Sequence, residues 1–259
     1  MKQIIIDTDG NLEALAAIEA ALQDPAADIR AITTVAAGLT AEEAAGNVLA
    51  VLDKTGHRGR TEVFAGASRS LNGKPARRLA SHKPLGGQTA PAGGGLAAVN
   101  AMIRLARAGG LEIITMGPLT NVALAFAKDR KAMAGVSRIT MLAGMIFHGD
   151  VGPMSEYNFF SDPHAADFVL RTGAAITLLP LEVGSYSERM RYALHPEYIR
   201  KKYASYTRID TDGELTYGAN INDVRDRGRK EFVAQNSVMH PFNCTLAADN
   251  SEEEITMEA

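Results

Sequence analysis

The sequence predicts an α/β fold: an open, mostly parallel sheet with helices on both faces. Short runs of β-branched residues alternate with alanine-rich stretches of helical length. The short runs are apolar at successive positions, which is typical of strands that are buried on both faces. No linker or change of composition divides residues 1–181. We therefore expect a single domain over residues 1–259.

The first half of the chain alternates strands and helices. Each expected strand is a run of isoleucine, valine or phenylalanine, and each expected helix is rich in alanine and leucine. Thr40 and Glu43 have the spacing of a capping box, which marks the start of a helix. The strands are predicted at 3–6, 29–35 and 62–65, and the helices at 12–22 and 40–52.

Two stretches of the second half predict long loops. Residues 73–95 are rich in glycine, proline and lysine, and residues 144–161 also lack a repeating pattern. Asp162 before Pro163 has the spacing of a helix cap followed by proline at the first helical position. Helices are predicted at 96–108, 119–127 and 164–171, around 196–206 and near 245, strands at 111–116, 136–142 and 174–181, and an acidic tail at 251–259.

Composition and charge exclude several function classes. The 259 residues include 27 basic and 30 acidic side chains, a net charge of −3, so attraction to nucleic acid or anionic lipid is not expected. Cys244 is the single cysteine and forms neither an internal disulfide nor a cysteine-based zinc site. The apolar run within residues 1–10 is too short for the core of a signal peptide, and no apolar run has membrane-spanning length. We expect a cytoplasmic protein with no nucleic-acid and no membrane partner.

Polar side chains collect where the predicted strands end. Ligands of open parallel sheets bind beyond the carboxyl ends of the strands. Several neighbouring carboxylates stay ionised only beside a cation or hydrogen-bond donors, so the site fits a hard metal ion or a polyhydroxylated ligand such as a sugar or nucleoside, and repels phosphate. The residues at these ends are Asp7, Asp9 and Glu13, 36–38, 117–121, the loop residues His148, Asp150, Glu156, Asn158 and Asp162, and Glu182.

Several of these residues also have a purely structural interpretation. Asp9 or Asn11 can cap the first helix, where an oxygen acceptor stabilises by about 1 kcal/mol. Thr120 and Asn121 can organise a turn, and Asp162 can cap the helix that follows it. The functional interpretation therefore depends on the convergence of several residues at one edge of the sheet.

Four segments resemble the motifs of the inosine–uridine-preferring nucleoside hydrolases, in order over residues 1–184. The resemblance implies a core at 1–184 and a divergent, shortened part at 185–259 within the single domain. Residues 7–14 (DTDGNLEA) are similar to D-x-D-P-G-x-D-D, and 34–39 (TVAAGL) to T-V-x-A-G-N. Residues 117–121 keep G-P-L-T-N unchanged, and 156–166 (EYNFFSDPHAA) are similar to E-F-N-x-x-x-D-P-x-A-A. The resemblance implies that family's Rossmann-like fold and the hydrolysis of a ribonucleoside or related riboside to base and ribose. It also implies a homo-oligomer, either a dimer or a tetramer.

The resemblance further implies a calcium ion and a water-activating carboxylate. In the family, the residue that matches Asp9 binds calcium and takes a proton from the attacking water, and the carbonyl that matches Met116 is another calcium ligand. A bound hard cation lowers the pKa of its water. The expected metal site also includes Asp7, beside Asp9, and Asn243, the nearest match to a family aspartate near the C-terminus.

The expected substrate-binding residues are matched in the same way. Glu13 matches the acidic position that contacts the ribose 2′- and 3′-hydroxyls, and Glu156 and Asn158 match positions that bind ribose hydroxyls. Asp150 matches a loop position that reaches the 5′ end, and Leu142 ends the strand before that loop. Cleavage of the C–N bond creates positive charge on the ribosyl ring, which a carboxylate-rich pocket stabilises.

The sequence departs from the family at the metal site. Ala14 stands where the family has a direct calcium ligand, and Asn243 replaces a carboxylate with an amide. Calcium takes about six to eight oxygens, several of them from carboxylates, so these changes weaken the expected site. Three outcomes stay open: a hydrolase with a weak or different ion, a metal-free hydrolase in which Asp9 and Asp7 activate water, and a ribose- or nucleoside-binding paralogue with altered specificity or without hydrolysis.

Protonation of the leaving base requires an acid that the motifs do not supply. His82 lies in the first long loop and His240 lies near the C-terminus, and both are candidates for this catalytic role. A histidine in a loop can equally be an ordinary solvated side chain.

A phosphatase of the haloacid-dehalogenase type is the rival enzyme class. Residues 6–12 (IDTDGNL) have its D-x-D-G motif, with Asp7 as the nucleophile, Asp9 as the acid and magnesium as the cofactor. The sequence has no convincing later lysine followed by paired aspartates, and this interpretation leaves the motifs at 117–121 and 156–166 unexplained.

Overall fold

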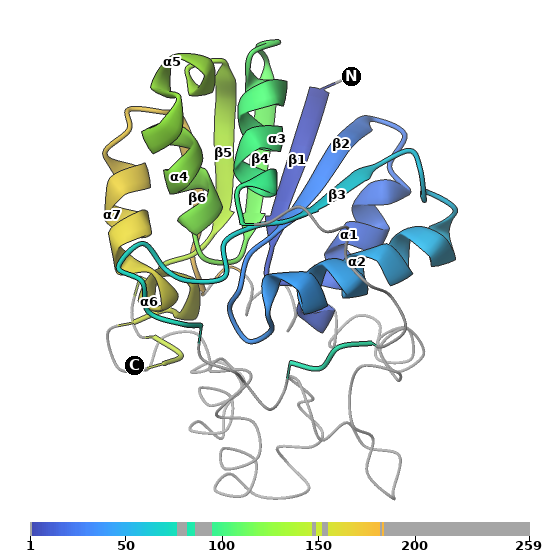
Figure 1. Cartoon of the computed structure of the whole chain (residues 1–259), viewed down its shortest axis with the longest axis horizontal. Coiled ribbons are helices and arrows are strands. Elements are labelled where there is room, and N and C mark those ends of the chain that lie inside the picture. Colours follow the sequence, from blue (N-terminus) through green and yellow to red (C-terminus); the bar gives the residue numbers. More distant parts are fainter. Residues whose placement is uncertain are drawn as a thin grey trace, which may run out of the picture. The chain divides into compact units, whose positions relative to one another are not determined.

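The computed structural model describes residues 2–76, 82–85, 95–146, 149–151, 155–181 and 183. Six strands within these residues form one sheet in the order β3-β2-β1-β4-β5-β6 (Figure 1). Neighbouring strands from β3 to β5 pair in parallel. The order is the doubly wound one, in which the chain builds outward from β1 in both directions. The strands are β1 (Lys2–Thr8), β2 (Ala27–Thr34), β3 (Glu62–Ala65), β4 (Leu111–Met116), β5 (Val136–Leu142) and β6 (Ile176–Leu179).

Helices follow the strands, and local sequence signals mark where several of them begin. Thr40 caps α2 with a full capping box to Glu43, and Asp162 caps α7 with Pro163 in the first turn, both as predicted. The helices of the described residues are α1 (Leu12–Leu22), α2 (Ala41–Thr55), α3 (Ala97–Ala106), α4 (Thr120–Lys128), α5 (Arg130–Met133), α6 (Tyr157–Ser161) and α7 (Pro163–Leu170).

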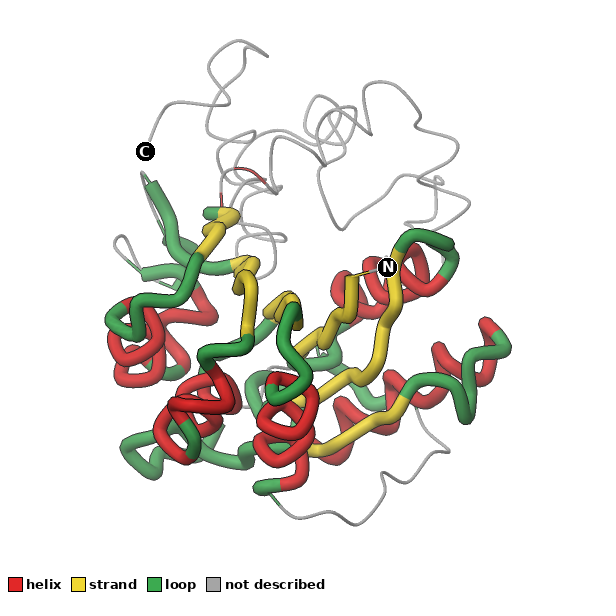
Figure 2. The backbone as a smooth tube through the Cα atoms, turned by 90° about the horizontal axis from the view of Figure 1, so that it is seen from above, coloured by secondary structure: helices red, strands yellow, loops and turns green. Residues whose placement is uncertain are grey.

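The two faces of the sheet support separate hydrophobic cores. Successive residues of a strand point to opposite faces, and Ile5 and Ile6 of β1 accordingly belong to different cores. Ile5 lies in a core with residues of α3, α4 and α7, whereas Ile6 lies in a core with residues of α1 and α2. Figure 2 shows helices on either side of the strands. The predicted open α/β sheet with helices on both faces is confirmed.

The chain divides into two compact units. The first comprises residues 1–143 and 158–178, and the second comprises 144–157 and 179–259. The first unit holds the residues of β1 to β5 and of α1 to α5. Most residues of the second unit lie outside the described part of the chain. The expectation of one domain over the whole chain stays a prediction.

Most predicted elements are present. Several differ in their bounds, and two helices were not predicted, one of which, α6, lies within the predicted loop 144–161. The sequence predicted neither α5 nor α6, because helices of four and five residues are too short to show a helical period. The last strand is shorter than the predicted 174–181, with β6 limited to Ile176–Leu179. The predicted helices around 196–206 and near 245 lie outside the described residues, as does most of the loop 73–95. In the described residues, no helix is long and apolar enough to cross a membrane.

Candidate functional site

The centre of the sheet brings the ends of β1 and β4 together. These two strands are neighbours at the point where the strand order reverses, and ligands of doubly wound sheets bind beyond this point. Thr8 pairs with Met116 at the carboxyl ends of the two strands, and the Asp9 N–H donates to the Met116 carbonyl at 3.4 Å. A Cβ on Gly117 would lie 2.9 Å from the Asp9 nitrogen, so this close approach requires glycine. The structure thus brings together Asp7, Asp9 and Met116.

Asp7 is enclosed completely. Its Oδ1 accepts hydrogen bonds from Thr33 Oγ1 at 2.6 Å and from Asn121 Nδ2 at 2.8 Å. Its Oδ2 is buried and has no hydrogen-bond partner among the described residues. Burial raises the pKa of Asp7 to about 7, although the two hydrogen bonds oppose this shift. Asp7 is therefore poised between its protonated and ionised forms near neutral pH.

Asp9 lies in the turn after β1 and is 1 % exposed. Its two carboxylate oxygens accept hydrogen bonds from the Asn11 backbone N–H at 3.1 Å and the Asn11 side-chain amide at 3.3 Å. The side-chain oxygen of Asn11 accepts from the Ala14 N–H at 2.8 Å and caps α1. Of the two capping candidates, Asn11 is the cap, and it also orients Asp9.

His82 contacts Asp9. Its Nε2 lies 3.6 Å from Asp9 Oδ2, so one of the two candidate acids is at the acidic turn. A Cβ on Gly38 would lie 2.4 Å from Cγ of the His82 ring. Gly38 belongs to the second motif segment, after β2, and its lack of a side chain lets the imidazole lie against the backbone there. The other candidate acid, His240, lies outside the described residues.

Asn121 joins the G-P-L-T-N segment to the end of β1. Besides Asp7, its Nδ2 donates to the Thr34 carbonyl at 2.9 Å, and its Oδ1 accepts from the Ala67 N–H at 2.8 Å. A Cβ on Gly66 would lie 2.3 Å from Asn121 Oδ1. The sequence indicated only a turn here, and the intact motif was the one signal that Asn121 does more.

A hydrogen bond between Thr120 and Asp162 connects the motif at 117–121 with the motif at 156–166. Thr120 Oγ1 donates to Asp162 Oδ2 at 2.7 Å, and the Leu71 N–H donates to the same oxygen at 2.8 Å. Asp162 Oδ1 accepts from the Ala165 N–H at 3.1 Å, which caps α7. All of these contacts are structural, in agreement with the capping interpretation of Asp162.

Asn158, Leu142 and Glu13 also belong to the first unit. Asn158 Nδ2 donates to the Leu142 carbonyl at 2.8 Å, and Asn158 is largely buried. The Leu142 side chain is exposed, as is Glu13 near the start of α1. The substrate-binding roles of these three residues stay predictions.

Glu156 and Asp150 belong to the second unit. Glu156 is buried, and its Oε2 accepts from the Gly144 N–H at 2.8 Å. Burial raises the pKa of Asp150 to about 6, against hydrogen bonds from its own backbone and from the backbones of Tyr157 and Val151. Their roles, and that of Asn243, which lies outside the described residues, also stay predictions.

The described residues around Asp9 do not fit a calcium ion. Calcium requires about six to eight oxygens, several of them from carboxylates. Position 14 carries the buried methyl group of Ala14, and the Met116 carbonyl already accepts the Asp9 N–H. Among the described residues, no three histidine, cysteine, aspartate or glutamate side chains are grouped to hold a metal. No chemical step is therefore assigned to a metal ion.

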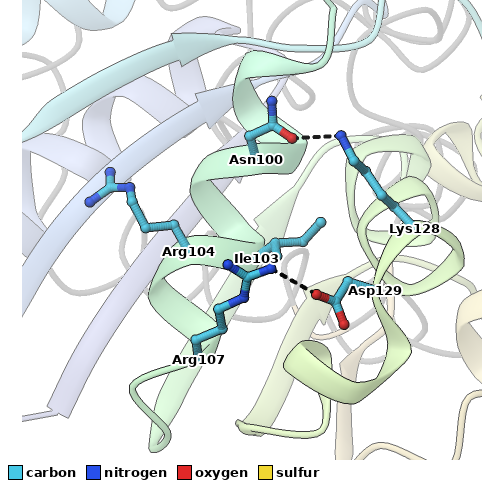
Figure 3. Close-up of a pocket in the computed structure, with 6 residues that line it drawn as sticks. All are labelled: Asn100, Ile103, Arg104, Arg107, Lys128 and Asp129. Atoms are coloured by element: carbon cyan, nitrogen blue, oxygen red, sulfur yellow. Dashed lines mark hydrogen bonds and ion pairs between the residues drawn. The ribbon is translucent and has the colours of Figure 1, made fainter.

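A cavity on the other edge of the sheet does not serve this site. It has a volume of about 250 Å³ and lies where α3 and α4 end, before β4 and β5 begin. Arg107 forms an ion pair with Asp129 at 3.0 Å, and Lys128 donates to Asn100 at 2.8 Å. Figure 3 shows its lining residues, Asn100, Ile103, Arg104, Arg107, Lys128 and Asp129.

Comparisons with known proteins agree with this architecture. An uncharacterized protein of Schizosaccharomyces pombe is 33 % identical over 192 residues, which cover 70 % of this chain and 61 % of that protein. Probable uridine nucleosidase 2 of Oryza sativa subsp. japonica is 32 % identical over 196 residues, which cover 70 % of this chain and 57 % of that protein. The chain thus spans about three fifths of the length of these relatives.

A solved structure and a family model agree with these relatives. A plant nucleoside hydrolase superposes with a TM-score of 0.64 at 23 % identity, covering 96 % of this chain and 79 % of that chain. At this identity, the likeness supports the fold. The sequence model of the inosine-uridine preferring nucleoside hydrolases matches residues 4–191, a range that includes the acidic turn after β1 and the motifs at α4 and α7. The chain belongs to the inosine-uridine preferring nucleoside hydrolase family.

Proposed function

We propose that this protein hydrolyses the N-glycosidic bond of a ribonucleoside or a related riboside and releases base and ribose. Asp9 is the observation that carries the proposal. It is a buried carboxylate at the reversal point of the sheet, oriented by Asn11 and contacted by His82. The family membership and the relatives named uridine nucleosidase support the same activity.

The chemistry follows from the properties of the carboxylate. Asp9 accepts a proton from a water molecule, and the water oxygen bonds to C1′ of the ribosyl ring. The C1′–N bond breaks, its electron pair moves to the base nitrogen, and the base leaves after that nitrogen gains a proton. Positive charge develops on the ring during this step, and nearby carboxylates stabilise it. Glu13, Glu156, Asn158 and Asp150 are the proposed ribose-binding residues.

Substitution of Asp9 tests the proposal. The full chain is incubated with uridine and with inosine, and free base is separated and measured by its absorbance. We expect Asp9→Asn to lower the rate of base release by about a hundredfold or more, because an amide cannot accept the proton. Asp167→Asn, an exposed carboxylate on α7 that pairs with Arg171, is the control and should keep the wild-type rate. An Asp9→Asn variant with an unchanged rate would overturn the role of Asp9.

Binding without hydrolysis is the second candidate function. The observation that favours it is Ala14, which leaves Asp9 without the neighbouring carboxylate of the family's calcium site. Calorimetry with uridine or ribose, together with long incubations, separates the two functions. Heat of binding without any release of base would support the binding function and contradict the hydrolase proposal.

The family match explains the D-x-D-G motif without a phosphatase activity. The family match that includes the D-x-D-G turn also includes the motifs that the phosphatase class left unexplained. The chain should therefore not cleave a chromogenic phosphate ester in the presence of magnesium. The homo-oligomeric state and the cytoplasmic location stay predictions.

A further inference from the structure

Asp9 has an ionisable neighbour within the chain. Nε2 of His82 lies 3.6 Å from Asp9 Oδ2, and the two side chains are 10 % and 1 % exposed. A carboxylate that is removed from water is stable only beside a cation or hydrogen-bond donors. Asn11 supplies two donors, and the imidazole of His82 supplies a third polar neighbour from another segment of the chain.

The surrounding backbone accommodates the imidazole. Three ring atoms of His82 lie within 2.8 Å of the position that a Cβ on Gly38 would occupy. Any other residue at position 38 would displace the ring or the backbone. The turn after β2 is therefore shaped to receive His82 beside the end of β1.

Asn47 of α2 holds the two partners together. Its Nδ2 donates to the Gly10 carbonyl at 3.0 Å and to the Lys83 carbonyl at 3.2 Å, and its Oδ1 accepts from the Leu85 N–H at 2.6 Å. Gly10 follows Asp9, and Lys83 follows His82. One buried amide thus anchors the residue next to the carboxylate and the residue next to the imidazole.

We propose that His82, presented by Asn47 and Gly38, is the positioning residue that holds Asp9 in place of a divalent cation, so that this chain binds no calcium at Asp9. The contact places His82 beside the carboxylate that is proposed to activate water. The proposal concerns the site of the proposed hydrolysis but does not depend on turnover, because the measurements below record metal binding and His82 itself.

Calcium titration of the full chain tests the first half of the proposal. Isothermal titration calorimetry of the wild-type protein should show no heat of one-to-one calcium binding. The melting temperature of the protein in calcium should not exceed its melting temperature in the presence of a chelator. The double variant Ala14→Asp with His82→Ala regains a carboxylate and loses the imidazole, and should bind calcium about tenfold or more tightly than the wild type. One-to-one binding of calcium by the wild type, abolished in Asp9→Asn, would overturn the proposal.

Side-chain nuclear magnetic resonance tests the second half. The chain has six histidines, and the nitrogen resonances of His82 are assigned by their loss in His82→Gln. We expect Asp9→Asn and Asn47→Ala to shift the Nε2 resonance of His82, and the matched control Asn100→Ala, on the exposed face of α3, to leave it in place. A His82 resonance that does not respond to Asp9→Asn contradicts the contact. A wild-type chain that releases no base but keeps the resonance response to Asp9→Asn would contradict only the proposed function.

Discussion

At the scale of single residues, Asp7 is the clearest case of a side chain controlled by its surroundings. Thr33 and Asn121 satisfy one carboxylate oxygen, while the other is buried and lacks a partner among the described residues. An ionised carboxylate is costly in such a place, because the lost hydration is only partly replaced. Burial accordingly raises the pKa of Asp7 from 3.8 to about 7.

This raised pKa predicts a pH-dependent effect of Asp7→Asn. The protonated carboxyl stabilises the folded state fully below its unfolded pKa of 3.8, and this stability is lost as the pH rises through about 7. Asparagine keeps an oxygen acceptor for Thr33 and Asn121 and never ionises. The variant should therefore be more stable than wild type at about pH 8, with a difference that shrinks toward about pH 5. Urea unfolding over this range measures the difference.

Asn100→Ala is the control for this pH dependence. Asn100 is exposed on α3, and neither asparagine nor alanine titrates. Its difference in unfolding free energy from wild type should be constant with pH. An Asp7→Asn variant with an equally constant difference would show that Asp7 does not titrate in this range.

At the scale of elements, the start of α1 is joined to the site, whereas the start of α2 is not. Asn11 caps α1 and also donates to both oxygens of Asp9. Thr40 caps α2, and its side chain and backbone N–H exchange hydrogen bonds with Glu43. Both helices begin with a side-chain cap, but only the cap of α1 also contacts the proposed catalytic carboxylate.

Removal of the two caps separates stability from activity. Asn11→Ala and Thr40→Ala should each lower the free energy of unfolding by about 1 kcal/mol. Asn11→Ala should also slow base release, because Asp9 loses the side-chain amide that orients it. Thr40→Ala should keep the wild-type rate. Urea unfolding and the base-release assay measure the two effects, and equal rates in the two variants would contradict the orienting role of Asn11.

At the scale of the whole first unit, the doubly wound order separates two edges of the sheet. The carboxyl ends of β1 and β4 carry Asp7, Asp9 and Met116, whereas the cavity between α3 and α4 lies at the amino ends of β4 and β5. Figure 3 shows the residues that line the cavity. Its position at the opposite edge of the sheet separates it from the proposed chemistry at Asp9.

Arg107→Ala tests this separation. The substitution removes an exposed ion pair with Asp129, and exposed pairs contribute little to stability. The variant should keep the wild-type rate of base release and nearly the wild-type melting temperature. A large loss of base release in this variant would contradict the placement of the functional site at the carboxyl ends of β1 and β4.

The sequence by itself determined the elements and the edge on which the site lies. β3, β4 and β5 have the predicted bounds, because short runs rich in β-branched and other apolar residues are a strong local signal. The capping residues Thr40 and Asp162 were also visible locally. The short helices α5 and α6 were not, since too few residues repeat.

Only the tertiary structure decided which side chains meet. The partner of Asp7 at Asn121 is 114 residues away, and the amide of Asn47 reaches Gly10 and Lys83 across 37 and 36 residues. No periodicity or spacing connects such positions, because their distance depends on how β1, β2, β4 and α2 pack. The motifs therefore marked Asp9 as a functional residue, but the folded chain made His82 its neighbour.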